Sequence, residues 1–427
     1  MMHILLIPFG TSGSIFPFIW LGKKLIERGH RVTIITSRLY ADRVLKAGIE
    51  FLAPEVDEMA VMLSKPDLWD RQRCTELAYK YGGRAAAHVF KAIHQIVREQ
   101  GAPDLIVAHM ISFGARMARE KHGIPLITVH LHPLAMMNAE EVPLLFPAIR
   151  WLRLLPCWAR EMILSLPSPH DAYALPAIQQ ACREQGIPPP RRLWREWYHS
   201  PDGVLAFYPE WYGRLKRGRP HNTFQWTFPM EDMAEQYPMD PELVHFLDSG
   251  EKPVIFTPGT GQIHASRFFE TAVHLTKATG CRAVFLTGKQ EQVPPALPDS
   301  IFVASYAPFS QLLPRSRAMV HHGGIGTLSQ CLKVGVPQLI VAMSFDQPDN
   351  AERVTKLGVG LGMDNADFTL PNALPLLQRC LRDEALLDRA QETSKKLQHQ
   401  PSVDDLMDWL ELARLIDPKI TKSASPP

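Results

Sequence analysis

Two short runs in the second half of the chain carry residue types that could hold a diphosphate. The first, His321 to Thr327 (HHGGIGT), follows a short apolar segment and precedes a helix-like one. Glycines at a strand-to-helix turn let the backbone approach a ligand, and the unpaired N–H groups of the first helical turn favour an anion. The second run, Phe345 to Asn350 (FDQPDN), offers acid and amide groups that could grip hydroxyls. The two runs predict a diphosphate site beside a hydroxyl-binding site.

Taken alone, a Gly-x-Gly run is as typical of a tight turn, and strand-end histidines are more often structural than ligands. The order and spacing of three segments favour the ligand site: Val320 to Thr327, Gly335 to Gln338 and Asp346 to Ala351. In these segments the chain resembles the nucleotide-sugar glycosyltransferases of the GT-B fold, which include plant, macrolide and glycopeptide enzymes. The resemblance implies an α/β fold of two Rossmann-like domains facing across a cleft, with a UDP- or dTDP-sugar as donor substrate, no cofactor and no metal.

The resemblance also implies roles for individual residues. His322 would hydrogen-bond the diphosphate, with His321 beside it, and Tyr306 would stack on the nucleobase while the backbone of Ala307 reads its edge. Asp346 and Gln347 would bind the sugar hydroxyls. The full set assigned to the donor is Thr260, Tyr306, Ala307, His321, His322, Gly324, Gly326, Thr327, Asp346 and Gln347.

The first strand-to-helix loop, Phe9 to Pro17, departs from the family pattern. Relatives usually carry an acid or a histidine there that is proposed to activate the acceptor, and the matching residue here is Ser14. A serine hydroxyl ionises far above neutral pH and cannot act as a simple base. His130 and His132 follow an apolar segment and are the best substitutes, since imidazole titrates near neutrality. His109 is a third choice, and for each a structural role is the alternative.

Further matching stretches, including Arg28 to Val32 and Phe285 to Gly288, make the chain most similar to the rhamnosyltransferases of rhamnolipid synthesis. This implies an inverting, metal-independent transfer of a hexose from a dTDP-rhamnose or UDP-glucose type of donor. The acceptor would be a hydroxyl of a lipophilic small molecule or of a hydroxy-fatty-acid lipid. Because Ser14 replaces the acid, a catalytically silent auxiliary protein that partners a true transferase is an alternative. An epimerase of the same architecture is disfavoured by the long apolar N-terminal segment.

Short apolar runs alternate with amphipathic segments in both halves of the chain, which predicts two doubly wound parallel sheets. We expect an acceptor-binding domain over 1–225, a linker over 226–245, a nucleotide-sugar-binding domain over 246–400 and a helix over 401–418 that returns to the first domain. The expected strands are Ile4–Pro8, Val32–Thr36, Leu105–Ala108, Leu126–Val129, Val254–Thr257, Ala283–Leu286, Ile301–Ala304, Ala318–Val320 and Gln338–Val341.

Composition and charge limit the class of protein to which the chain can belong. The 427 residues are 46% hydrophobic and 21% charged, as in folded soluble proteins. Residues 1–225 contain 28 basic and 20 acidic side chains, a net charge of +8, and show no nucleic-acid-binding motif. The six scattered cysteines favour a reducing compartment, and we expect a cytoplasmic protein. The apolar and basic segment 144–166 has three interpretations: an acceptor-pocket wall, a peripheral membrane contact or a helical cap on the first domain.

Overall fold

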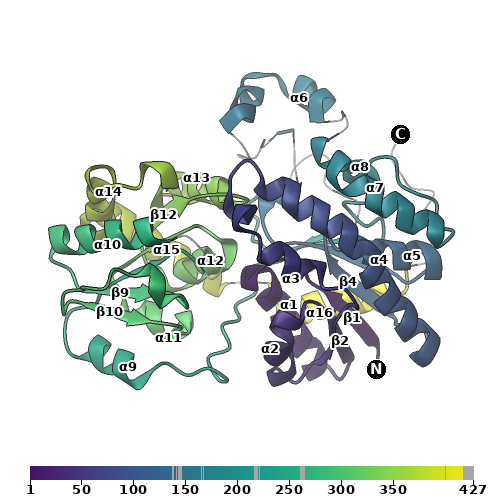
Figure 1. Cartoon of the computed structure of the whole chain (residues 1–427), viewed down its shortest axis with the longest axis horizontal. Helices are drawn as coiled ribbons and strands as arrows, with labels where there is room; N and C mark the ends of the chain where they lie inside the picture. The colour runs from purple at the N-terminus through teal and green to yellow at the C-terminus, as the bar shows by residue number, and fades with distance from the viewer. Residues whose placement is uncertain are drawn as a thin grey trace. The chain divides into compact units, whose positions relative to one another are not determined.

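The computed structural model of the chain is drawn in Figure 1. It describes residues 1–136, 139–140, 142, 147–164, 166, 168–215, 220, 222–259, 265–399 and 401–416, with only the backbone at 147–150 and 169. The chain divides into two compact units. Unit 1 is Met1–Pro229 together with the chain from Pro401 on, and unit 2 is Met230–Gln400.

Unit 1 is built on a seven-stranded parallel sheet of order β3-β2-β1-β4-β5-β6-β7. Its central strands are almost entirely apolar because helices cover both faces of such a sheet, and every residue of β4 and β5 is buried. The strands are β1 His3–Ile7, β2 Arg31–Ile35, β3 Glu50–Leu52, β4 Leu105–His109, β5 Leu126–His130, β6 Val204–Ala206 and β7 Thr223–Gln225. The strand order reverses between β1 and β4, so the loops after these two strands meet at the carboxyl edge of the sheet.

The helices of unit 1 include one of 27 residues, α4, which packs against α3, α5 and α7. They are α1 Ser12–Glu27, α2 Ala41–Lys46, α3 Glu58–Leu63, α4 Cys74–Gln100, α5 Phe113–His122, α6 Cys157–Leu164, α7 Pro169–Glu184, α8 Leu193–Glu196 and α16 Val403–Ala413. The last of these belongs to unit 1 although it follows unit 2 in the chain. Its acidic side chains Asp404, Asp408 and Glu411 pair with Arg28, and Trp409 stacks on Phe224 with ring centroids 5.2 Å apart.

Unit 2 repeats the same architecture with a six-stranded parallel sheet of order β10-β9-β8-β11-β12-β13. The strands are β8 Val254–Thr257, β9 Ala283–Leu286, β10 Ile301–Ala304, β11 Ala318–His321, β12 Gln338–Ala342 and β13 Gly360–Asp364. The helices are α9 Pro241–Asp248, α10 Ser266–Thr279, α11 Phe309–Leu312, α12 Ile325–Val334, α13 Gln347–Leu357, α14 Leu370–Arg382 and α15 Glu384–Gln398. The order reverses between β8 and β11, which places the loops after these strands at a topological switch point.

The predicted fold class of two Rossmann-like parallel sheets is confirmed by these strand orders. All nine predicted strands are present within one residue at each end, whereas β3, β6, β7 and β13 were not predicted. Three of the missed strands have only three residues, and β13 contains two glycines, so none shows a strong apolar run. Among the described residues, no helix is long and apolar enough to cross a membrane.

Candidate active site

The loop after β11 leaves the start of α12 uncapped. Gly323 takes a φ of +91°, which favours glycine, and a side chain there would meet Ile340 at 2.5 Å. Gly324 occupies the N-cap position and, having no side chain, provides no capping hydrogen bond. The first N–H groups of a helix have no partner within the helix, so those of Gly326 and Thr327 point to where an anion would bind. The sequence therefore builds a local anion site at the switch point of unit 2.

His321 shapes this loop from inside. Its ring is fully buried, its Nδ1 accepts a hydrogen bond from the Gly323 N–H at 3.1 Å, and its Nε2 lies 3.0 Å from Gln338 Oε1. These bonds require the proton on Nε2, and burial lowers the pKa of this histidine to about 3. Both ring nitrogens are thus used within the protein. His321, which was predicted to contact the donor, instead holds the Gly323 turn in place through these two bonds.

His322 is the histidine of the pair that keeps exposed surface. Its ring lies between two glycines: a methyl group on Gly259 would sit 2.6 Å from its Cε1, and one on Gly324 would sit 2.5 Å from its Nε2. Burial lowers the pKa of His322 to about 4, although the nearby carboxylate of Asp346 acts in the opposite direction. The Nδ1 atom is buried and has no hydrogen-bond partner within the protein. The ring is consequently neutral at pH 7 and can donate one hydrogen bond.

The loop that follows β12 is tied to the anion loop by Asn350. Its Nδ2 donates to the Gly323 carbonyl at 2.9 Å and to Asp346 Oδ2 at 2.7 Å. The side-chain Oε1 of Gln347 accepts hydrogen bonds from the backbone N–H groups of Met343 and Ser344 at 2.9 and 3.1 Å. Gln347, one of the two predicted sugar ligands, therefore also holds the loop between β12 and α13 in place. Asn350 was not predicted as a site residue, although it lies within the Asp346 to Ala351 motif that carries the resemblance.

The predicted nucleobase residues follow β10. Tyr306 is partly exposed, its hydroxyl donates to the Asp232 carbonyl, and its ring meets Tyr237 edge-on at 5.9 Å. Ala307 is buried. Thr260 lies outside the described residues, while Gly259 before it takes a φ of +91° and donates its N–H to Thr257 Oγ1 at 3.3 Å. The described part of the predicted donor set thus comes from the carboxyl ends of β10, β11 and β12, with Gly259 following β8.

The predicted catalytic histidines occupy unit 1 at different depths. His130 has no exposed surface, and its Nε2 lies 2.9 Å from His199 Nδ1. Burial lowers its pKa well below the usual value, so the ring is a poor proton acceptor. His130 is therefore corrected from a candidate base to a core residue. His109 is likewise buried, and its pKa falls to about 3. Only His132 of the three keeps partial exposure.

Ser14 lies in the first turn of α1 beside the first loop. Gly10, with a φ of +126°, passes so close that a side chain there would meet the Ser14 Oγ at 2.9 Å. Serine fits here because it is small, and its backbone N–H bonds to the Thr11 carbonyl at 2.8 Å. The position is thus tightly packed, and it holds no ionisable group.

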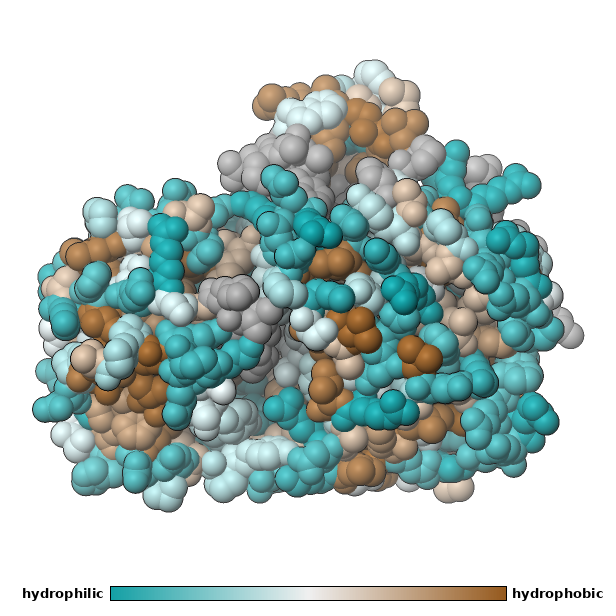
Figure 2. Space-filling view, viewed as in Figure 1, coloured by the Kyte–Doolittle hydropathy of each residue, from teal (hydrophilic) through white to brown (hydrophobic). Residues whose placement is uncertain are grey.

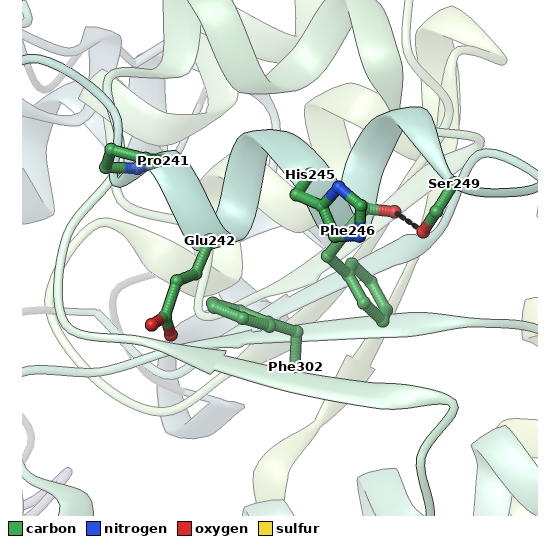
Figure 3. Close-up of a pocket in the computed structure, with 6 residues that line it drawn as sticks. All are labelled: Pro241, Glu242, His245, Phe246, Ser249 and Phe302. Atoms are coloured by element: carbon green, nitrogen blue, oxygen red, sulfur yellow. Dashed lines mark hydrogen bonds between the residues drawn. The ribbon is translucent and has the colours of Figure 1, made fainter.

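A surface hollow of about 440 Å³ lies on unit 2, away from these loops (Figure 3). It is lined by one side of α9 and by Phe302 of β10, and the rings of Phe246 and Phe302 are 5.4 Å apart. The hollow is open and almost wholly apolar, and none of its lining residues belongs to the loops described above.

Comparisons with known proteins agree with the fold. Residues 4–135 match the glycosyltransferase family 28 N-terminal domain, and residues 282–412 match the erythromycin biosynthesis protein CIII-like C-terminal domain. The chain is 26% identical to glycosyltransferase GtfE of Amycolatopsis orientalis over 90% of this chain and 91% of that protein. It is 28% identical to O-mycaminosyltylonolide 6-deoxyallosyltransferase of Streptomyces fradiae over 84% of each.

A solved structure of the glycotransferase of kitacinnamycin superposes with a TM-score of 0.72 at 20% identity, covering 96% of this chain and 99% of that one. This likeness establishes the fold over nearly the whole chain. The first family model lies in unit 1, and the second covers most of unit 2 and continues over α16 of unit 1. Both describe sugar-transfer or antibiotic-biosynthesis proteins. The two parallel sheets and the solved structure give the chain the GT-B fold. The glycosyltransferase domain match and the relatives named as glycosyltransferases support sugar-transferase activity.

Proposed function

We propose that the protein transfers a hexose, with inversion and without a metal, from a UDP- or dTDP-sugar of the UDP-glucose or dTDP-rhamnose type. The acceptor is a hydroxyl of a lipophilic small molecule or a hydroxy-fatty-acid lipid. The observation that carries the proposal is the meeting of His322 with the uncapped start of α12 at the switch point of unit 2. This combination suits a diphosphate, whose negative charge grows as the sugar leaves.

Each described residue of the loops then has a chemical task. His322 donates a hydrogen bond to the diphosphate, and the N–H groups of Gly326 and Thr327 add further donors. Asp346 and Gln347 bind the sugar hydroxyls, and Tyr306 stacks on the base next to the Ala307 backbone. Thr260, which lies outside the described residues, is proposed as a phosphate contact. The acceptor class draws on the name of the Streptomyces fradiae relative, which describes a deoxysugar transfer to O-mycaminosyltylonolide.

The donor site is tested by thermal unfolding with nucleotides. We expect UDP or dTDP at millimolar concentration to raise the melting temperature, because a ligand at about 100 times its dissociation constant adds about 2.7 kcal/mol to the stability of the folded state. UMP and dTMP are the matched controls, since they lack the second phosphate and should give a smaller shift. If neither diphosphate raises the melting temperature, the donor-site assignment fails. Nucleotide release from UDP-glucose and dTDP-rhamnose then tests the choice of donor.

A line of exposed apolar side chains on unit 1 supports the lipophilic part of the proposal. Trp151, Leu154, Trp158, Met162 and Leu166 recur every three or four residues, and Trp158 and Leu154 are 69% and 87% exposed. In Figure 2, hydrophobic residues gather at the top of the view, where Figure 1 places α6. Trp151 and Leu154 lie in a 3₁₀ helix, Pro147–Leu154, whereas Trp158 and Met162 lie in α6. Exposed tryptophan and leucine side chains on short helices are typical of contact with a membrane surface.

We expect this apolar line to hold the protein on anionic vesicles. Unit 1 is the basic part of the chain, which adds an electrostatic attraction that neutral vesicles lack. Replacing Trp151 and Trp158 together by Ser should weaken binding to phosphatidylglycerol vesicles by about 100-fold or more, because each buried aromatic contributes roughly 1.5–3 kcal/mol. Co-sedimentation measures the effect, and the exposed Leu412→Ser on α16 is the control. Equal binding of the double variant and wild type would contradict the membrane contact.

A further inference from the structure

The loop between β12 and α13 contains a turn that few side chains adopt without strain (Figure 1). The Gln347 N–H donates to the Ser344 carbonyl at 3.2 Å, which closes a four-residue turn. Phe345, the second residue of the turn, has a φ of +55°, and Asp346, the third, has a φ of −78° and a ψ of −9°. These angles fit a type II′ turn, which strongly favours glycine as its second residue. Phenylalanine occupies that position here.

The surrounding loop holds the turn in this shape. A bulky residue with a positive φ is strained, and such strain persists only where neighbouring groups fix the backbone. Gln347 fixes it from the far end of the turn, because its side-chain Oε1 accepts hydrogen bonds from the backbone N–H groups of Met343 and Ser344. Gln347 is 3% exposed, so water competes little for these bonds. The chain therefore keeps a backbone conformation that costs free energy directly beside a predicted sugar ligand.

The turn ends at Asp346, whose carboxylate is not used in the usual way. Asp346 is the N-cap residue of α13, a position in which an aspartate side chain commonly accepts a hydrogen bond from the first turn of the helix. It makes no such capping bond. Its Oδ2 instead accepts a hydrogen bond from Asn350 Nδ2 at 2.7 Å, and the residue stays partly exposed. The carboxylate is thus oriented by Asn350 and is not spent as a helix cap.

The same asparagine links the turn to the loop of the proposed diphosphate site. Asn350 Nδ2 also donates to the carbonyl of Gly323, the residue after His322, at 2.9 Å. Burial lowers the pKa of His322 to about 4, and the nearby carboxylate of Asp346 opposes this shift. All of these residues lie in unit 2. The carboxylate and the histidine therefore form one local cluster, and the turn at Phe345 delivers the carboxylate to it.

We propose that Phe345 is a positioning residue for the donor sugar. The inference rests on the proposed function, in which Asp346 accepts a hydrogen bond from a sugar hydroxyl. A carboxylate can only accept hydrogen bonds, so its oxygen must lie where the hydroxyl proton points. The positive φ of Phe345 sets the direction in which the chain enters Asp346 and so places this oxygen. The affinity for the sugar then depends on whether residue 345 can adopt a positive φ, and not on the size or polarity of its side chain.

Four variants at position 345 separate the backbone from the ring. Glycine and asparagine adopt a positive φ readily, alanine does so poorly and the β-branched valine worst of all. Isothermal titration calorimetry measures the dissociation constants of UDP-glucose and UDP, and of dTDP-rhamnose and dTDP. We expect Phe345→Val to weaken binding of the nucleotide sugar about tenfold or more, as for the loss of a hydrogen bond to a charged group, and Phe345→Ala to weaken it less. Phe345→Gly and Phe345→Asn should stay within about twofold of wild type. UDP and dTDP should bind all four variants as they bind wild type, because neither carries the sugar.

A double-mutant cycle tests whether Phe345 acts through Asp346. Asp346→Ala should weaken binding of the nucleotide sugar at least as much as Phe345→Val, and adding Phe345→Val to Asp346→Ala should cause no further loss. Phe302→Val is the matched control, because Phe302 is a partly exposed phenylalanine of unit 2 that lines the hollow beside α9. Its affinities for all four ligands should equal those of wild type.

The assignment is overturned if Phe345→Gly binds the nucleotide sugar as weakly as Phe345→Val, since the ring would then make the contact. It is also overturned if the affinity for UDP or dTDP falls together with that for the nucleotide sugar, or if the double variant loses more than Asp346→Ala alone. Should Phe345→Val fail to fold, the comparison of Phe345→Ala with Phe345→Gly decides. Absence of UDP and dTDP binding to wild type would instead refute the proposed function, and the role of Phe345 with it.

Discussion

Replacing His322 by Ala is expected to lower nucleotide release from the donor sugar by about 100- to 1,000-fold, the usual effect of removing one preorganised donor from a charge-stabilising site. The ring is held between Gly259 and Gly324, so it needs no reorganisation when the diphosphate binds. It is neutral at pH 7 because burial lowers its pKa to about 4. It therefore acts as a fixed hydrogen-bond donor and not as a charge. The measurement is steady-state release of UDP or dTDP.

Two further variants separate the ring's chemistry from its packing. Gly324→Ala keeps every polar group but places a methyl group 2.5 Å from His322 Nε2, so the ring must shift and turnover should fall. Ala is compatible with the backbone here, where φ is −62°. His322→Gln retains an N–H donor and should recover part of the loss. His274→Gln, on the exposed side of α10, serves as the control. Turnover of His322→Ala within tenfold of wild type would show that the ring does not bind the leaving group.

The strands were predictable because parallel sheets covered on both faces need continuous apolar runs. Ile4–Pro8 and Leu105–Ala108 stand out from their surroundings for that reason, and both form central strands. Short edge strands carry no such signal. Helix α1 begins at Ser12, so Pro17 lies buried within the helix and not at its start.

For the site, sequence reasoning identified the loops but not the direction of each side chain. His321 and His322 are adjacent and chemically identical, yet one closes its own loop and the other faces the glycines. That difference arises because neighbouring residues at a strand end point to opposite sides. Asn350 is similar in this respect, because it donates to the carbonyl of Gly323, which lies 27 residues earlier in the chain.

Burial depth was the second quantity that the sequence could not supply. His130 and His132 are two residues apart, but His130 ends a strand inside the sheet and pairs with His199, which is 69 residues later in the chain.

Lowering the pH from about 6.5 to 4 is expected to destabilise both units. Burial lowers the pKa of His109 and His321 to about 3, and that of His199 and His322 to about 4. In the unfolded chain these rings take up protons near pH 6.5, while in the folded protein they stay neutral. The unfolded state then binds more protons, so the free energy of unfolding falls as the pH drops through this window. Each fully buried ring contributes roughly 1.4 kcal/mol per pH unit.

Urea unfolding at several pH values between 4 and 7 measures this slope, and His321→Gln isolates one ring of it. The variant removes a group that is fully buried and bonded on both nitrogens. It should be less stable than wild type at pH 7, where the neutral imidazole bonds are intact, and its slope should be smaller by about 1.4 kcal/mol per pH unit. His274→Gln removes an exposed histidine and should leave the slope unchanged.

An unchanged slope in His321→Gln would mean that the ring titrates in the folded protein as it does in the unfolded chain. In that case burial would not keep His321 in the neutral form whose Nδ1 accepts the hydrogen bond from Gly323. Because the same turn sets the start of α12, loss of donor binding should accompany the acid transition in wild type.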